Sequence, residues 1–129
     1  MSYSQTDLIK YRIERAKDTF NEGKILSEYE SWNGAANRFY YACFHIIAAY
    51  LAKQGLKATT HSGLKATFNK ELIKTGIISK EKGTLFNKLF ELRQEADYDD
   101  FVEMNEEDIQ SLIPEIEQLI TKIESILKE

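Results

Sequence analysis

The 129-residue chain is 43% hydrophobic and 29% charged, with a formal net charge of −4. This length suits a single domain with its own core, and the composition excludes a disordered chain. Its one cysteine, Cys43, cannot form an intramolecular disulfide, and the N-terminus has no apolar core of signal-peptide type, so we expect a cytoplasmic protein. The longest uncharged run, residues 39–52, is too short to span a bilayer, and we expect no membrane association.

Charge is distributed unevenly along the chain. Basic residues predominate in residues 53–93, and acidic residues predominate in residues 94–129. One interpretation is a basic face that binds phosphates and an acidic face that repels them. The alternative is that packing brings the two segments together, so that their fields largely cancel.

The first two helices are predicted by their caps and their apolar spacing. Ser4 can cap a helix, with Asp7 in the capping-box position, and Gly23 is expected to end that helix. A second helix is predicted over residues 28–53, with Gly55 marking its end. This second helix is apolar almost all round, which is typical of the centre of a bundle.

Three further helices follow. A shorter one is predicted over residues 59–74, preceded by two threonines that can cap it and closed by Gly76, and a longer one over residues 79–98. The last begins at Asn105, and Pro114 is expected to bend it. Its apolar residues recur at spacings of three and four, the pattern of a bundle seam: Ile109, Ile113, Ile116, Ile120, Ile123 and Leu127.

No strand pattern competes with these helices, and no linker or repeat divides the chain. We therefore predict an all-α fold and a single domain over residues 1–129. The expected architecture is an up-and-down bundle of four long helices plus one short helix.

Polar residues on the apolar second helix are candidates for function. Arg38, Tyr41 and His45 share one stripe. Arg38 and His45 are two turns apart, about 10 Å along the helix axis, which excludes a direct bond between them. That separation suits two groups that hold one extended ligand, or that each meet a partner from another helix. His45 can equally be a packed core residue, and His61 is expected to face solvent or to cap its helix.

The fourth helix contributes Arg93 and Asp97, which are spaced for an intrahelical ion pair. A guanidinium on a mostly apolar helix needs a carboxylate or a phosphate. Asp97 can therefore pair instead with Arg38 across the helix contact, or Arg38 can bind a ligand directly. The candidate ligand-binding set is Arg38, Tyr41, His45, Arg93 and Asp97.

No metal or cofactor is predicted. Two histidines and one cysteine without ligand spacing argue against zinc. The group Asp97, Asp99, Asp100 and Glu103 is interpreted as a solvated acidic turn rather than a magnesium site. The sequence also has no Gly-rich phosphate loop, Ser-His-Asp arrangement or dinucleotide fingerprint.

Residues 35–45, which contain Arg-Phe-Tyr-Tyr-Ala-Cys-Phe-His, and residues 92–98 together resemble the signature pair of the HEPN family of small helical domains. Residues 53–56, 60–64 and 89–93 extend the resemblance over almost the whole chain. The resemblance implies an up-and-down bundle that dimerises. It also implies an association with a minimal nucleotidyltransferase, beside which such domains are often encoded as a toxin–antitoxin pair.

Ribonuclease members of this family carry an arginine followed closely by a histidine. This implies metal-independent chemistry, in which the histidine acts on the ribose 2′-hydroxyl and the arginine stabilises phosphate charge. Arg93 matches the motif arginine, but Tyr98 stands at the histidine position, and a tyrosine with an unperturbed pKa of about 10 is a poor base at pH 7. Arg38 and His45 fit the spacing but lie on the second helix. The catalytic candidates are therefore Arg93, Tyr98 and His45.

The residues and the resemblance lead to two hypotheses of function, one a binding module and the other an enzyme. The first is a non-catalytic binding module, a homodimer that contacts a minimal nucleotidyltransferase and holds a nucleotide or nucleic acid beside the basic residues 53–88. The second is a divergent metal-independent endoribonuclease toxin that uses Arg93 with Tyr98 or His45. A third hypothesis makes Tyr98 or Tyr41 a target for nucleotidylation by the partner. Of these, the binding module is the predicted function.

Overall fold

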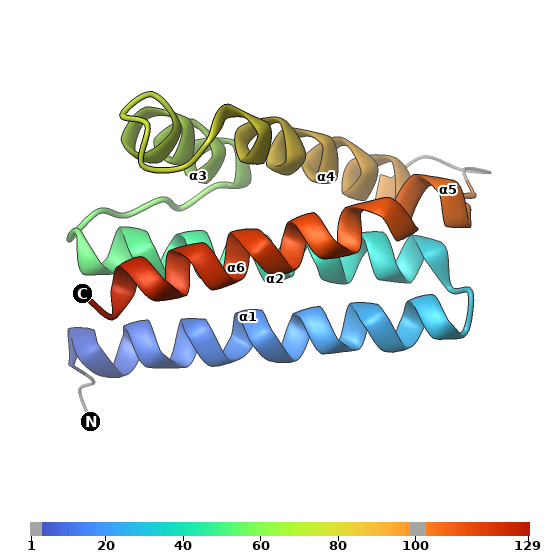
Figure 1. Cartoon of the computed structure of the whole chain (residues 1–129), viewed down its shortest axis with the longest axis horizontal. Helices are drawn as coiled ribbons and strands as arrows, with labels where there is room; N and C mark the ends of the chain where they lie inside the picture. Colours follow the sequence, from blue (N-terminus) through green and yellow to red (C-terminus); the bar gives the residue numbers. More distant parts are fainter. Residues whose placement is uncertain (1–3, 99–102) are drawn as a thin grey trace.

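The computed structural model describes residues 4–98 and 103–129, and it is built from helices in this part of the chain. Two long helices form an N-terminal hairpin, and the later helices pack against the second of them (Figure 1). The predicted all-α bundle is confirmed. In chain order the elements are α1 (Gln5–Glu28), α2 (Trp32–Lys53), α3 (His61–Phe68), the π-helical turn η1 (Asn69–Ile73), α4 (Lys80–Tyr98), α5 (Glu106–Ile109), the 3-10 turn η2 (Gln110–Leu112) and α6 (Ile113–Leu127).

α1 begins where its cap predicts and runs past its expected end. The Asp7 N–H donates to Ser4 Oγ at 3.1 Å, and the Ser4 N–H donates to the Asp7 carboxylate at 3.2 Å. The helix continues through Gly23 to Glu28, so the end predicted at Gly23 is wrong. A close helix contact accounts for this glycine, because a Cβ atom built there would lie 2.5 Å from Cε1 of the Phe39 ring.

α2 lies at the centre of the bundle, as its apolar surface predicts. It packs against α1, α4 and α6 (Figure 1). It begins at Trp32 rather than near residue 28, after Glu30 turns the chain with a φ of 59°. Its end at Lys53, followed by Gly55 with a φ of 71°, agrees with the prediction. Among residues 4–98 and 103–129, no helix combines the length and the apolar character needed to cross a membrane.

The helix predicted over residues 59–74 divides into α3 and the π-helical turn η1. Thr60, one of the two threonines expected to cap it, accepts a hydrogen bond from the Gly63 N–H at 2.9 Å. Gly76, with a φ of 80°, then turns the chain towards α4. α4 agrees with the helix predicted over residues 79–98 and packs along α2.

The last predicted helix is divided by a 3-10 turn. Asn105 caps α5 in a capping box with Asp108, as the sequence predicts. The 3-10 turn η2 follows, and Pro114 lies in the first turn of α6, where its missing N–H costs no helical hydrogen bond. The disturbance that the sequence predicts at Pro114 therefore takes the form of a division into α5 and α6 directly before the proline. The isoleucine seam packs into the core as predicted, and its buried members are Ile109, Ile116, Ile120 and Ile123.

Candidate functional site

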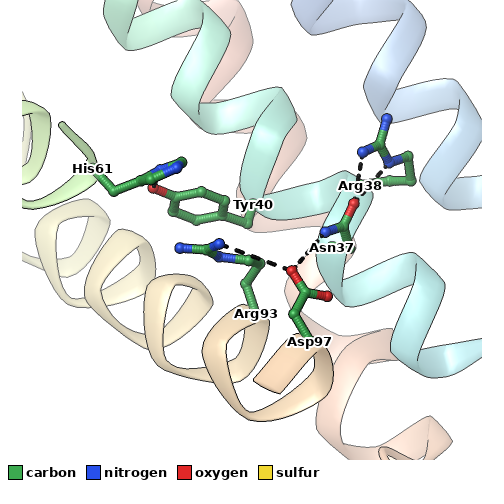
Figure 2. A network of polar contacts seen from close by, with 6 residues as sticks. All are labelled: Asn37, Arg38, Tyr40, His61, Arg93 and Asp97. Carbon is green, nitrogen blue, oxygen red and sulfur yellow. Dashed lines mark hydrogen bonds and ion pairs between the residues drawn. The ribbon is translucent and has the colours of Figure 1, made fainter. Parts of the chain in front are cut away.

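A network of polar contacts lies where α4 and the start of α3 meet α2 (Figure 2). Helical spacing explains much of its arrangement, because residues three or four apart share one face of a helix. We call the following six residues the polar network: Asn37, Arg38 and Tyr40 of α2, His61 of α3, and Arg93 and Asp97 of α4.

Arg93 is the buried centre of the polar network. Its side chain is only 4% exposed. Its guanidinium carbon lies 4.9 Å from the Tyr40 ring centroid and 5.9 Å from the centroids of Tyr41 and Phe90. Arg93 Nη1 lies 3.8 Å from Asp97 Oδ2, which confirms the ion pair predicted within α4. Aromatic faces and a carboxylate together offset the cost of removing this guanidinium from water.

Asn37 links Asp97 to Arg38. Asn37 Nδ2 donates to Asp97 Oδ2 at 2.9 Å, and Asn37 Oδ1 accepts from Arg38 Nη2 at 2.6 Å and from Arg38 Nε at 3.0 Å. This bridge replaces the direct Arg38–Asp97 ion pair considered from the sequence. Arg38 instead reaches Glu22 at 3.4 Å and lies 5.6 Å from the Tyr41 ring centroid. Its side chain is 31% exposed, so this end of the polar network is open to solvent.

His61 lies at the opposite end of the polar network. Tyr40 Oη and His61 Nδ1 share a hydrogen bond of 2.8 Å. Burial raises the pKa of the Tyr40 phenol above its usual range, against the opposing charge of Arg93. Burial, followed by the charge of Arg93, lowers the pKa of His61. A protonated phenol beside a neutral imidazole fits a bond in which the hydroxyl donates to Nδ1.

The expectation that His61 faces solvent or caps its helix is wrong, because His61 is partly buried and Thr60 supplies the cap. Its contact with Tyr40 depends on how α3 folds back onto α2, and no local pattern signals that. Sequence reasoning also misses Asn37. The sequence does contain one signal for Asn37, namely its position directly before Arg38. An amide there can accept a hydrogen bond from the arginine and donate one to a carboxylate.

His45 lies two turns along α2 from Arg38, and its ring neighbours are Tyr41 and Phe44. It is half-buried rather than enclosed, and it lines a groove of about 660 Å³ formed by the start of α1, the second half of α2 and the loop before α3. Burial lowers the pKa of His45 to about 4, with further contributions from the positive charges of α1 and α2. The cations responsible are Arg15, Arg38 and Arg12. His45 is therefore neutral at pH 7.

The basic and acidic segments of the chain pack together in part. Lys53 Nζ donates to the Leu127 carbonyl at 3.0 Å and to the Glu129 carbonyl at 3.2 Å. Lys82 Nζ donates to Gln118 Oε1 at 2.7 Å. A cation at the C-terminal end of α6 also complements the dipole of that helix. These contacts bring the two segments side by side, as the second interpretation of the charge asymmetry requires, through carbonyl and amide oxygens.

Part of the predicted site lies outside the described residues. Tyr98 ends α4, but its side chain falls outside the described part, as do Asp99 and Asp100 of the acidic turn. Among the described side chains, no group of three or more His, Cys, Asp or Glu residues is placed to hold a metal ion.

The fold and the site define a helical-bundle domain with an arginine-centred polar network between two of its helices. The family described as the HEPN domain matches residues 9–126, and the chain belongs to that family. A Thermotoga maritima protein named "UPF0332 protein" is 37% identical over 95% of this chain and 92% of the relative. Two Methanocaldococcus jannaschii proteins, each named "Putative toxin", are 33% and 32% identical. Their alignments cover 94% and 78% of this chain, and 90% and 69% of the relatives.

Proposed function

We propose that this HEPN domain is a non-catalytic binding module that forms a homodimer and acts with a minimal nucleotidyltransferase in a toxin–antitoxin-type system. The names of two relatives support a toxin-related role. The observation that carries the non-catalytic part is the enclosure of Arg93, whose charge is held by Asp97 and three aromatic rings. A guanidinium packed in this way cannot reach a phosphate in solvent without a rearrangement of α4.

The proposed ligand contact is the exposed end of the polar network. Arg38 is partly exposed, lies over Tyr41 and is oriented by its two hydrogen bonds to Asn37. A guanidinium can bind a phosphate through two parallel hydrogen bonds, and an aromatic ring can stack on a base. The ligand class of this proposal is a nucleotide or nucleic acid whose phosphate contacts Arg38.

A binding titration tests the ligand contact. Fluorescence anisotropy of a labelled single-stranded RNA, with ATP as a competitor, measures the dissociation constant of wild type and of Arg38→Ala. We expect the substitution to weaken binding by about tenfold, since it removes a charged phosphate contact. Lys24→Ala is the matched control, because Lys24 lies 5.1 Å from the Phe20 ring centroid on α1 and also pairs a cation with an aromatic face. Equal affinities of wild type and Arg38→Ala would contradict the proposed contact.

Incubation of a mixed RNA pool with the wild-type protein in EDTA tests the non-catalytic part. We expect the RNA to remain intact while circular dichroism shows a folded protein. Cleavage by wild type that disappears in a folded Arg93→Lys variant would overturn this part of the proposal.

A divergent metal-independent endoribonuclease is the second candidate, and one observation favours it. His61 brings a neutral imidazole to the neighbourhood of Arg93, although the motif histidine position is occupied by Tyr98. In this alternative Arg93 stabilises phosphate charge while His61, Tyr98 or His45 transfers the proton. Cleavage lost in His61→Ala and retained in His45→Ala would assign the reaction to the polar network.

Co-expression with a tagged minimal nucleotidyltransferase from the same organism tests the partner. We expect the two proteins to purify together as a complex of defined stoichiometry. Separate elution of two folded proteins would argue against the partnership. It would not affect the proposed ligand contact at Arg38, which the binding titration tests.

A further inference from the structure

The groove beside His45 is a cavity that the proposed function does not use. The start of α1, the second half of α2 and the loop before α3 enclose about 660 Å³ there. Sites for small molecules have volumes of about 300 to 1,000 Å³, so the groove is large enough for one. None of the six residues of the polar network lines it. The groove is therefore separate from the network.

Large apolar side chains form much of the groove wall. Leu8 and Tyr11 of α1 both line it, and they are 38% and 59% exposed. Water thus covers an apolar surface here, and a ligand with an apolar body would release that water. The largest apolar residues of the wall are Leu8, Tyr11, Phe44, Leu51, Leu56 and Leu64.

The charged side chains of the groove are cations. Arg12 and Lys57 line it, and its described lining contains no Asp or Glu, although the chain has 21 acidic and 17 basic residues. The charges of Arg15 and Arg38 also reach the groove, since both lower the pKa of His45. The groove is therefore electropositive and favours an anion.

Hydrogen-bond donors for an anion gather where α1 meets the middle of α2. Arg12 Nη1 donates to the Ala48 carbonyl at 3.0 Å, which holds the guanidinium beside α2 and leaves its other N–H groups for a ligand. His45 lies one helical turn before Ala48 and has no hydrogen bond to another described residue. A neutral imidazole carries one N–H that can donate. Arg12 and His45 can therefore hold one anionic group together.

The backbone of α2 fixes the direction in which such a ligand lies. The carbonyls of the last turn of a helix carry negative partial charge, which disfavours an anion there and acts only over about that turn. His45 lies eight residues, about 12 Å, before the last residue of α2. The anionic head therefore belongs beside Arg12 and His45, and the apolar body extends towards Leu56.

We propose that this groove binds an amphipathic carboxylate, a molecule with one anionic head and an apolar body of the size of a medium-chain fatty acid. Arg12 binds the carboxylate through its N–H groups, His45 donates a further hydrogen bond, and the apolar wall covers the chain. A planar guanidinium matches the geometry of a carboxylate. This inference goes beyond the proposed function and does not rest on the ligand contact at Arg38.

An NMR titration of the labelled protein with octanoate tests the class of ligand. Octanol is the matched probe, because it keeps the eight-carbon chain and lacks the charge. We expect octanoate to bind about tenfold more tightly than octanol, since a charge-assisted hydrogen bond is lost with the carboxylate. Equal affinities would overturn the carboxylate class. No binding of octanoate to the folded protein would overturn the site.

Two variants test the location, with circular dichroism to confirm that each is folded. Arg12→Gln should weaken octanoate binding by about tenfold, whereas Lys10→Gln should not, because Lys10 is an exposed cation of α1 that does not line the groove. Leu8→Ser should weaken it by about threefold through lost apolar contact. Its control is Ile25→Ser, since Ile25 is 52% exposed on α1 outside the groove. Unchanged affinity in both Arg12→Gln and Leu8→Ser would overturn the location.

The two histidines provide a readout that does not depend on affinity. A carboxylate beside His45 offsets the positive charges that lower its pKa, so saturating octanoate should raise the pKa of His45. Octanol should not raise it. His61 belongs to the polar network and should keep its pKa with either probe, which makes it an internal control. An unchanged His45 pKa at saturating octanoate would overturn the placement of the carboxylate.

Discussion

The two arginines of the polar network have the same chemistry and opposite surroundings. Arg93 lies under three aromatic rings with its side chain 4% exposed, whereas Arg38 lies at the solvent edge with its side chain 31% exposed. Asp97 and Asn37 connect them. Arg93, which matches the family motif, is therefore enclosed by the fold, and Arg38 is the arginine of the network that solvent reaches.

Replacing Arg93 with alanine tests the enclosed arginine and has the largest expected effect. The substitution removes three ring contacts and the cationic partner of Asp97, so the free energy of unfolding should fall by about 2 to 3 kcal/mol. Urea unfolding followed by circular dichroism measures the change. Arg93→Lys is the matched control: it keeps the charge, loses the planar guanidinium and should recover only part of the loss. A fully stable Arg93→Ala would show that the enclosure contributes little.

Tyr40→Phe tests the link from Arg93 to His61. Loss of the hydroxyl removes the bond to His61 Nδ1, and we expect a destabilisation of about 1 kcal/mol. The same bond favours neutral His61, so its removal should raise the pKa of His61 in an NMR titration. Tyr11→Phe is the control, because Tyr11 is exposed on α1. If the pKa of His61 is unchanged in a folded Tyr40→Phe variant, the Tyr40 hydroxyl does not donate its proton to His61 Nδ1.

Arg38→Ala tests the exposed arginine and should cost the fold little. A partly exposed ion pair, one cation–ring contact and two hydrogen bonds to Asn37 at the solvent edge predict a loss of about 1 kcal/mol. Thermal unfolding with and without ATP then separates fold from binding, because a ligand that binds the native state raises the melting temperature. We expect ATP to stabilise wild type and to have a much smaller effect on Arg38→Ala. If Arg38→Ala destabilises the protein as much as Arg93→Ala does, the two arginines contribute equally to the fold and the proposed difference between them is contradicted.

The parts of the fold that the sequence predicted are those with local causes. The capping boxes at Ser4 and Asn105 need residues only three positions apart, and the isoleucine seam needs only a helical period. The prediction that α1 ends at Gly23 is wrong, because this glycine makes room for the Phe39 ring of α2 and does not end the helix. The disturbance predicted at Pro114 appears as the 3-10 turn directly before it, and the proline lies in the first turn of a new helix, where it is tolerated.

The candidate site likewise contains contacts with local causes and contacts that depend on the packing of distant helices. The Arg93–Asp97 pair spans one turn of a helix and was predictable from spacing. The contacts of Asn37 and His61 join different helices, and they depend on how α3 and α4 pack against α2. The burial that distinguishes Arg93 from Arg38 also arises only in the packed bundle. Spacing could nominate both arginines, but only the fold assigns them different surroundings.

His45, in the groove beside α1, is a further half-buried group whose ionisation depends on its surroundings. Burial, and then the charges of Arg15, Arg38 and Arg12, lower its pKa. Its pKa lies near 4 in the folded protein and at its ordinary value of 6.5 in the unfolded chain. Between these values the unfolded chain binds a proton that the folded protein does not, so protonation favours unfolding. The contribution of His45 to stability is therefore complete above pH 6.5 and is lost as the pH falls towards 4.

His45→Gln should remove this part of the pH dependence, and the effect is the smallest expected here. Urea midpoints at pH 7 and pH 5 measure it for wild type and variant. Wild type should lose more stability than His45→Gln over this interval, since carboxylates elsewhere titrate alike in both proteins. Equal losses would mean that His45 ionises as freely in the groove as in the unfolded chain. Burial and the charges of Arg15, Arg38 and Arg12 would then have no effect on the pKa of His45.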